Sequence, residues 1–129
     1  MLSSLAAAVP ERGRVLEIGT GVGVGTAWIS AGLGQRNNVE VLRVEVDQRL
    51  SDAARSWPWP VNVRVLTADA FELIETFGTF DLVFLDAFPG KYDHIEPAIK
   101  LVRPGGFLLV DDLKHIMGKS ETNANKDAL

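Results

Sequence analysis

The chain has 129 residues and a formal net charge of −4, which is the size of one domain that can bury a hydrophobic core. Hydrophobic residues make up 47% of it and cysteine is absent, so the composition indicates a globular, cytoplasmic domain without disulfides, thiolate metal ligands or a thiol nucleophile. Lys and Arg are scattered singly, which argues against nucleic-acid binding. No apolar run approaches the roughly 18 residues that a membrane span needs.

Short apolar runs alternate with longer amphipathic stretches along the chain. The apolar stretch before Pro10 has no basic start, so we expect the end of a helix and not a signal peptide. Five runs rich in Val, Leu, Ile and Phe predict buried strands: Arg14–Ile18, Val41–Val46, Val61–Leu66, Asp81–Leu85 and Gly106–Val110. Four stretches predict helices: Thr26–Gly32, Gln48–Ser56, Ala70–Thr76 and Tyr92–Val102. This alternation predicts an α/β fold, a doubly wound parallel sheet with helices on both faces, in one domain over residues 1–129.

Three segments depart from the regular alternation. Pro97 is expected to kink the fourth helix or to delay its start. Trp57-Pro58-Trp59-Pro60 breaks the chain before the third strand, and we interpret its tryptophans as a hydrophobic plug. Residues 117–129 are polar, which predicts a solvent-exposed or frayed tail outside the core of residues 13–112.

The segment Glu17-Ile-Gly-Thr-Gly-Val-Gly23 follows the first strand directly and opens onto a helical stretch. Its glycines, at positions 19, 21 and 23, allow positive φ angles and a close approach of a ligand to the main chain. The helix that follows offers unpaired N–H groups at its N-terminus. We therefore expect a nucleotide-like cofactor to lie across this loop. Val24 stands where the dinucleotide fingerprint has its third glycine, which disfavours an NAD-linked oxidoreductase.

Acidic residues follow the carboxyl end of every later strand. Ligands of open parallel sheets bind beyond these ends, and carboxylates gathered at one edge repel one another, so stability alone does not account for the pattern. The acids in question are Glu45, Asp47, Asp69, Asp86, Asp111 and Asp112.

Each acid also has a structural interpretation. Glu45 lies at the right distance after the loop to accept both ribose hydroxyls, although it could instead cap a helix or face solvent. Asp47 suits the N-cap of the helix that begins at Gln48. Asp69 could bond an adenine amino group or cap the following helix, and the sequence does not choose between the two.

Glu17 is unusual because it lies inside a core strand. A buried carboxylate needs partners, so we expect it to hold the loop amides or to help anchor a cationic ligand. Asp86 and Asp111 are the candidates to face a reacting centre, whereas Asp112 could cap whatever follows.

Five segments, taken in order, resemble the class I S-adenosylmethionine-dependent methyltransferases over residues 13–112. They are Val15-Leu-Glu-Ile-Gly-Thr-Gly21, Val44-Glu-Val-Asp47, Ala68-Asp-Ala70, Phe80-Asp-Leu-Val-Phe-Leu-Asp-Ala87 and Leu101-Val-Arg-Pro-Gly-Gly106. Within that superfamily the chain is most similar to bacterial O-methyltransferase-type proteins related to the catechol O-methyltransferase group. The resemblance implies a Rossmann-like sheet with strand order 3-2-1-4-5 and methyl transfer from S-adenosylmethionine to a hydroxyl of a small-molecule acceptor.

The resemblance also assigns site residues. It places the methionine part of the cofactor near Gly19 and Gly21, the ribose on Glu45, and the adenine beside Asp69 and Ala70. Together with the loop argument, it predicts these cofactor-binding residues: Glu17, Gly19, Thr20, Gly21, Gly23, Glu45, Asp69, Ala70 and Asp86.

The catechol-type enzymes hold a divalent cation with one Asp after strand four and an Asp-Asn pair after strand five. The matching residues here are Asp86, Asp111 and Asp112, which could hold Mg²⁺. The catalytic lysine of that group is matched by Pro89, and Lys91 is near but not aligned. The predicted catalytic residues are Asp86 as base or metal ligand, then Asp111, with Lys91 facing the substrate.

The family continues after strand five with a helix and a final antiparallel hairpin, and further helices at its N-terminus cover the substrate. The chain ends at Leu129, so we expect the hairpin to be lacking and Gly106–Val110 to form an apolar edge. The chain would then be a fragment, a homodimer through this edge, or a minimal domain whose tail covers it. Two other functions stay open: an aminopropyl transferase resembling spermidine synthase, which shares the Leu85-Asp-Ala-Phe88 type of sequence, and a non-catalytic cofactor-binding fragment or subunit.

Overall fold

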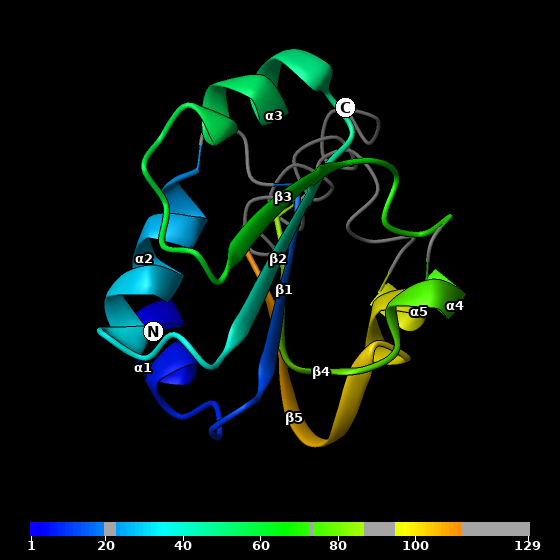
Figure 1. Ribbon diagram of the computed structural model, residues 1–129. Coiled ribbons are helices and arrows are strands. Elements are labelled where there is room, and N and C mark those ends of the chain that lie inside the picture. The colour runs from blue at the N-terminus through cyan, green and yellow to red at the C-terminus, as the bar shows by residue number, and fades with distance from the viewer. Residues whose placement is uncertain (20–22, 73, 87–94, 112–129) are drawn as a thin grey trace, which may run out of the picture.

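The computed structural model describes residues 1–19, 23–72, 74–86 and 95–111, and its centre is a parallel sheet of five strands (Figure 1). The strand order is β3-β2-β1-β4-β5, and every neighbouring pair is parallel. The strands are β1 (Arg14–Ile18), β2 (Glu40–Glu45), β3 (Val63–Thr67), β4 (Phe80–Leu85) and β5 (Val102–Val110). This topology confirms the predicted Rossmann-like sheet and its 3-2-1-4-5 order.

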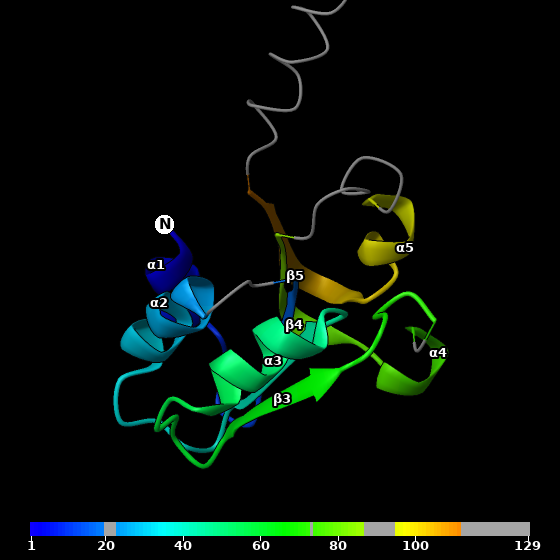
Figure 2. The ribbon, with the colours of Figure 1, turned by 90° about the horizontal axis from the view of Figure 1, so that it is seen from above.

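Helices cover both faces of the sheet, as a doubly wound fold requires. Three of them lie on one side: α1 (Leu2–Ala7), α2 (Val24–Leu33) and α3 (Gln48–Arg55). On the other side lie α4 (Ile74–Phe77) and α5 (Ile95–Ile99), and the view from above separates the two layers (Figure 2). Helix α3 is capped by Asp47, whose carboxylate accepts from the N–H groups of Arg49 and Leu50, so the predicted N-cap is confirmed.

The two hydrophobic cores follow the period-two alternation of the strands. Leu16 and Ile18 belong to the core under α4 and α5, while Val15 packs with Ile29 and Leu33 in the core under α1 and α2. Glu17 follows the parity of Val15, so its side chain lies on the face covered by α1, α2 and α3. The same parity applies to every strand, and it decides which residues can meet at the carboxyl edge.

Two predicted helices are shorter in the structure. The helix expected over Ala70–Thr76 begins only at Ile74, because the Asp69 carboxylate accepts from the N–H of Phe71 and forms a turn there. The helix expected over Tyr92–Val102 ends at Ile99, and Val102 already opens β5. Pro97 lies in the first turn of α5, where a missing N–H is tolerated; the expected start at residue 92 lies outside the described residues.

Strand β5 is an edge of the described sheet, and Phe107 on it is 51% exposed. The expected absence of a hairpin and the covering tail concern residues 112–129, which lie outside the described ranges. Pairing of this edge with a second copy stays a prediction; light scattering and amide exchange over residues 106–110 would test it.

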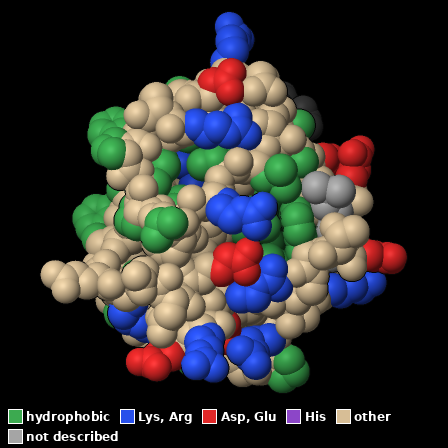
Figure 3. Space-filling model, in the orientation of Figure 1, with side chains coloured by type: hydrophobic (Ala, Val, Ile, Leu, Met, Phe, Trp, Pro, Cys, Tyr) green, Lys and Arg blue, Asp and Glu red, His purple; other side chains and the backbone are tan. Residues whose placement is uncertain are grey.

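Basic and acidic side chains are interspersed on the face that Figure 3 shows. In the described part of the chain, no helix combines the length and apolar character needed to cross a membrane.

Candidate functional site

The hydrogen bonding between neighbouring strands continues for one residue beyond their carboxyl ends. Four N–H groups just past the strand ends still donate to the neighbouring strand: Gly19 to Val44 (2.8 Å), Ala68 to Glu45 (3.0 Å), Asp86 to Ile18 (2.9 Å) and Asp111 to Leu85 (3.1 Å). These bonds bring the ends of all five strands to one edge, so the residues that follow them form a single rim.

Two rows of side chains cross the sheet on the face that α2 covers. In the first row, Arg43 pairs with Glu17, Glu17 with Phe84, and Phe84 with Leu109. Two positions further along each strand, the same register leads to the second row, which contains Glu45, Gly19, Asp86 and Asp111. Arg43, Glu17 and Phe84 of the first row are buried and Leu109 is half-buried. We call this row the buried floor and the second row the polar rim.

Glu17 occupies the centre of the floor. Its Oε2 accepts from the hydroxyl of Thr26 in α2 at 2.5 Å and lies 3.5 Å from Nε of Arg43 in β2. Its Oε1 is buried and has no hydrogen-bond partner among the described residues. A Cβ on Gly25 would lie 2.0 Å from this oxygen and 2.9 Å from the ring of Phe84. The missing side chain at Gly25 thus makes room for the carboxylate.

The groups around Glu17 shift its pKa in opposite directions. The pKa of Glu17 is raised from 4.5 to about 7, mainly because burial outweighs the Thr26 hydrogen bond and the charge of Arg43, which both lower it. The charges of Asp86 and Glu45 raise the pKa further. A carboxyl group with this pKa changes its protonation state near neutral pH, so its charge is sensitive to any cation that binds beside it.

The two described ends of the glycine loop, Gly19 and Gly23, have backbone conformations that favour glycine. Gly19 has φ 69° and Gly23 has φ 111°. Gly23 is the N-cap of α2, and a Cβ there would lie 2.9 Å from the Trp59 ring and 3.2 Å from Nη1 of Arg43. Thr20 and Gly21, both predicted to bind the cofactor, lie outside the described residues.

The second strand end carries the predicted ribose ligand. Glu45 is buried, and its Oε1 accepts from the N–H of Asp47 at 3.2 Å. The hydrogen bond from Phe71 shows that Asp69 does stabilise a turn, and its side chain is exposed. Ala70 packs in the core under α4 and α5. Ribose binding by Glu45 and adenine binding beside Asp69 and Ala70 stay predictions.

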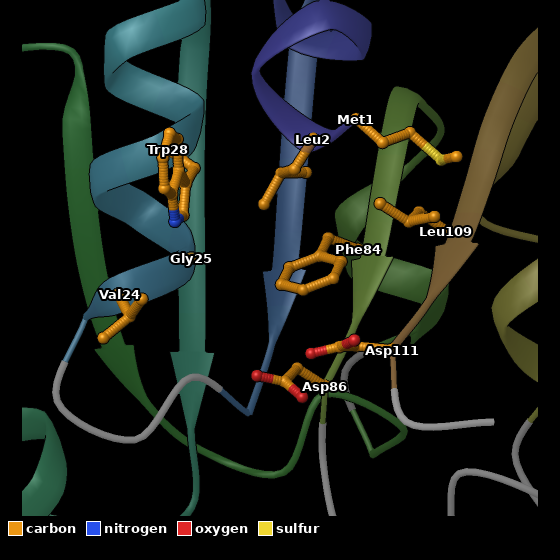
Figure 4. Close-up of a pocket in the computed structure, with 9 residues that line it drawn as sticks. All are labelled: Met1, Leu2, Val24, Gly25, Trp28, Phe84, Asp86, Leu109 and Asp111. Carbon is orange, nitrogen blue, oxygen red and sulfur yellow. The ribbon is translucent and has the colours of Figure 1, made fainter. Parts of the chain in front are cut away.

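A pocket of about 370 Å³ opens beside the N-terminal turn of α2 (Figure 4). Its walls are mainly apolar, and the two carboxylates of Asp86 and Asp111 lie next to each other at one end of it. The remaining lining residues are Met1, Leu2, Val24, Gly25, Trp28, Phe84 and Leu109. The structure therefore brings together the two acids that the sequence predicts at the reacting centre. Lys91 lies outside the described residues.

The described residues do not complete a metal site. Asp86 and Asp111 share the pocket, but Asp112 falls outside the described ranges. Within those ranges no group of three or more His, Cys, Asp or Glu side chains is arranged to hold a metal ion. Mg²⁺ binding stays a prediction, and the chemistry below does not depend on it.

Sequence reasoning missed Arg43, which belongs to the floor, and Thr26, which contacts Glu17 from α2. Arg43 is fully buried in β2, although it interrupts an apolar run. That interruption, on the strand after one that contains a lone Glu, was a readable signal of a buried ion pair. Trp59 is half-buried and donates its indole N–H to the carbonyl of Ala54, while Trp57 is 60% exposed. The hydrophobic plug is therefore Trp59, and the prediction for Trp57 was wrong.

Residues 16–113 match the family model described as a methyltransferase domain. The matched region begins in β1 and ends just beyond β5, so it contains the glycine loop, the buried floor and the polar rim. The chain belongs to the class I S-adenosylmethionine-dependent methyltransferases.

Individual relatives agree with this assignment. The chain is 37% identical over 125 residues to a catechol O-methyltransferase of Mycobacterium tuberculosis, covering 87% of this chain and 53% of that protein. Among solved structures, it is similar to cofactor-bound Rv0187 from MTB, with a TM-score of 0.72, 34% identity and coverage of 84% of this chain and 52% of that one. It also resembles an O-methyltransferase from Bacillus cereus in complex with SAH, with a TM-score of 0.68, 29% identity and coverage of 84% and 53%. The chain spans about half the length of the curated relatives it matches.

Proposed function

We propose that this chain transfers the methyl group of S-adenosylmethionine to a hydroxyl group of a small molecule. The observation that carries the proposal is that the Asp86 and Asp111 carboxylates lie next to each other in a pocket lined by Val24 and Gly25, in the first turn of the helix that follows the glycine loop. Family membership supports the choice of cofactor, and the O-methyltransferase names of the relatives support a hydroxyl acceptor.

The buried floor suits a cofactor that carries positive charge. S-adenosylmethionine has a sulfonium and an ammonium group, and Glu17 offers a buried carboxylate oxygen with no hydrogen-bond partner among the described residues. The N-terminus of α2 offers N–H groups to the cofactor's carboxylate. Glu45 would accept from the ribose hydroxyls, and the turn at Asp69 and Ala70 would adjoin the adenine.

The pocket suits an acceptor with an apolar body and a hydroxyl at one end. Val24, Trp28 and Leu109 supply apolar walls, and Asp86 and Asp111 supply the polar end. Its volume of about 370 Å³ lies within the range of small-molecule sites. An acceptor bound in this way would direct its hydroxyl towards the two carboxylates and the loop.

Methyl transfer is then an in-line displacement. The acceptor's hydroxyl oxygen attacks the methyl carbon, the carbon–sulfur bond breaks with its electron pair going to sulfur, and the hydroxyl proton passes to the Asp86 carboxylate. Protein groups contribute by aligning the oxygen with the methyl carbon and by excluding water. A carboxylate base at this position contributes a rate factor of roughly 10²–10⁴.

Calorimetric titration of the purified chain tests the proposal. We expect micromolar binding of S-adenosylmethionine and S-adenosylhomocysteine, and much weaker binding of NAD⁺ and decarboxylated S-adenosylmethionine. An acceptor screen that measures S-adenosylhomocysteine release, with and without Mg²⁺, would then identify the hydroxyl compound.

Other outcomes distinguish the alternatives. Preference for decarboxylated S-adenosylmethionine would favour aminopropyl transfer, which membership of a methyltransferase family makes less plausible. Binding of S-adenosylmethionine without turnover of any acceptor would favour a non-catalytic cofactor-binding subunit. Absence of binding would overturn the proposal for the chain by itself and would fit its half-length relative to its relatives.

A further inference from the structure

The buried floor contains one cation, Arg43, at a position that neither the proposed chemistry nor the rim requires. Arg43 and Glu17 are cross-strand neighbours in β2 and β1, and both side chains are fully buried. An arginine in the middle of a core strand is costly to desolvate, so it persists in such a place when its charge has a function or a partner. Arg43 forms an ion pair with Glu17, whose Oε1 lies against Gly25, a residue that lines the pocket.

The Arg43 guanidinium also lies close to Trp59 and to Gly23 at the end of the glycine loop. Its Cζ lies 5.6 Å from the centroid of the Trp59 ring, within cation–π range. Both the Trp59 ring and Nη1 of Arg43 approach Gly23, the residue that ends the glycine loop. Arg43 therefore lies between the carboxylate of Glu17 on one side and the indole and loop glycine on the other.

We propose that Arg43 is a positioning residue for the cofactor. Its guanidinium keeps the Glu17 carboxylate directed at the space behind Gly25 and Phe84, and with Trp59 it supports the loop at Gly23. The inference rests on the proposed function, because it assumes that the ligand of this site carries positive charge.

The charges around Glu17 explain why one arginine matters. Glu45 on β2 and Asp86 after β4 favour the protonated form of Glu17, while Arg43 on β2 and the Thr26 hydroxyl on α2 favour the ionised form. With Arg43 present, the pKa of Glu17 already lies at about 7, mainly because of burial. Without Arg43 two negative groups would face the carboxyl with no opposing cation among the groups that shift its pKa, and the carboxyl would be neutral at pH 7.

The test is the pH dependence of S-adenosylmethionine affinity, measured by calorimetry between about pH 6 and pH 9. In the wild-type chain we expect the affinity to rise through the ionisation of Glu17. In Arg43→Met the midpoint of that rise should move upward by about one pH unit or more, because an opposite charge at this distance typically shifts a carboxyl by that amount. Arg43→Lys keeps the charge and should keep the midpoint close to that of the wild type. A purely structural role for Arg43 would lower affinity equally at all pH values.

A double variant guards against misfolding of Arg43→Met. Glu17→Gln with Arg43→Met removes both buried charges, which is far less damaging than leaving one of them unpaired. After circular dichroism confirms the fold, this variant should bind S-adenosylmethionine weakly and without a pH-dependent rise near neutrality.

The outcomes separate the inference from the proposed function. If the wild-type chain binds S-adenosylmethionine but Arg43→Met keeps the same midpoint, or the double variant keeps the same rise, the role of Arg43 is rejected and the methyltransferase proposal stands. If the wild-type affinity is independent of pH, the inference is likewise rejected alone. If the wild-type chain does not bind S-adenosylmethionine at any pH, both are rejected together.

Discussion

The hydroxyl of Thr26 donates a hydrogen bond of 2.5 Å to Oε2 of Glu17, and both side chains are fully buried. This bond joins the first turns of α2 to the strand that precedes the glycine loop. The bond holds Oε2 in place, and the other oxygen, Oε1, is directed at Gly25 and Phe84. The position of Glu17 is thus determined by two neighbouring elements, α2 through Thr26 and β2 through Arg43.

The raised pKa of Glu17 makes stability depend on pH. The unfolded carboxyl ionises near 4.5 and the folded one near 7, so between these values the folded state keeps a proton that the unfolded state has released. The contribution of Glu17 therefore falls as pH rises through this window, by up to about 3 kcal/mol. Thermal unfolding of the wild type and Glu17→Gln from about pH 5 to pH 8 should show the wild type losing more stability than the variant. Parallel curves would contradict the raised pKa.

Substitutions at two glycines of α2, Gly25 and Gly32, distinguish an effect on the cofactor site from an effect on helix packing. Gly25→Ala places a Cβ against the Glu17 carboxylate, whereas Gly32→Ala places one 2.1 Å from the carbonyl oxygen of Ser3, where α1 packs on α2. Both changes overpack a contact, at a cost of about 1–3 kcal/mol, partly offset by the higher helix propensity of alanine. Only Gly25→Ala should also weaken S-adenosylmethionine binding, by about tenfold or more.

Denaturant unfolding and calorimetry on the same two variants make this comparison. Equal losses of cofactor affinity in both would show that the effect is one of stability and that Glu17 does not contact the ligand.

The fold was predictable from the sequence because its strands are apolar runs of ordinary length separated by helical stretches. Of the two predicted helices that are shorter in the structure, the one after β3 has a clear physical cause. Ala70 to Thr76 has a helical composition, but the side-chain hydrogen bond of Asp69 competes with helix formation. A local pattern cannot decide between a capped helix and a turn when one Asp suits both.

The site was only partly predictable for a different reason. Asp86 and Asp111 follow strand ends, so the general rule for parallel sheets places them together without any knowledge of distances. The Glu17–Arg43 contact depends on the register of β1 against β2, which pairs residues 26 positions apart in the chain. Residue spacing and composition do not predict this register, so the direct pairing of Glu17 with Arg43 is known only from the assembled sheet.

The two neighbouring tryptophans provide a matched pair for the loop. Trp59 contacts Gly23 and Arg43, while Trp57 is largely exposed. Trp59→Leu should destabilise the chain by about 1–3 kcal/mol and lower S-adenosylmethionine affinity, because the loop loses its support at Gly23. Trp57→Leu should stay within about 0.5 kcal/mol in stability and keep its affinity. If both variants bind the cofactor like the wild type, Trp59 contributes only to stability and not to cofactor binding.

The proposed base is tested by Asp86→Asn, which keeps the size of the side chain and removes its charge. Turnover of an identified hydroxyl acceptor should fall by roughly 10²–10⁴-fold, because the hydroxyl proton loses its acceptor. Affinity for S-adenosylmethionine should change by only a few-fold, since the floor beneath the loop is intact. Asp52→Asn, which removes an exposed charge on α3, is the control and should keep full turnover.

The same assay in the presence of Mg²⁺ or of a chelator determines whether the Asp86 effect involves a metal. Loss of wild-type turnover on chelation, restored by Mg²⁺, would make Asp86 a metal ligand. Turnover insensitive to chelation, together with a large loss in Asp86→Asn, would make it the base, because the carboxylate then acts without a cation. Unchanged turnover in Asp86→Asn would remove this residue from the chemical step and leave Asp111, its neighbour in the pocket, as the next candidate for proton transfer.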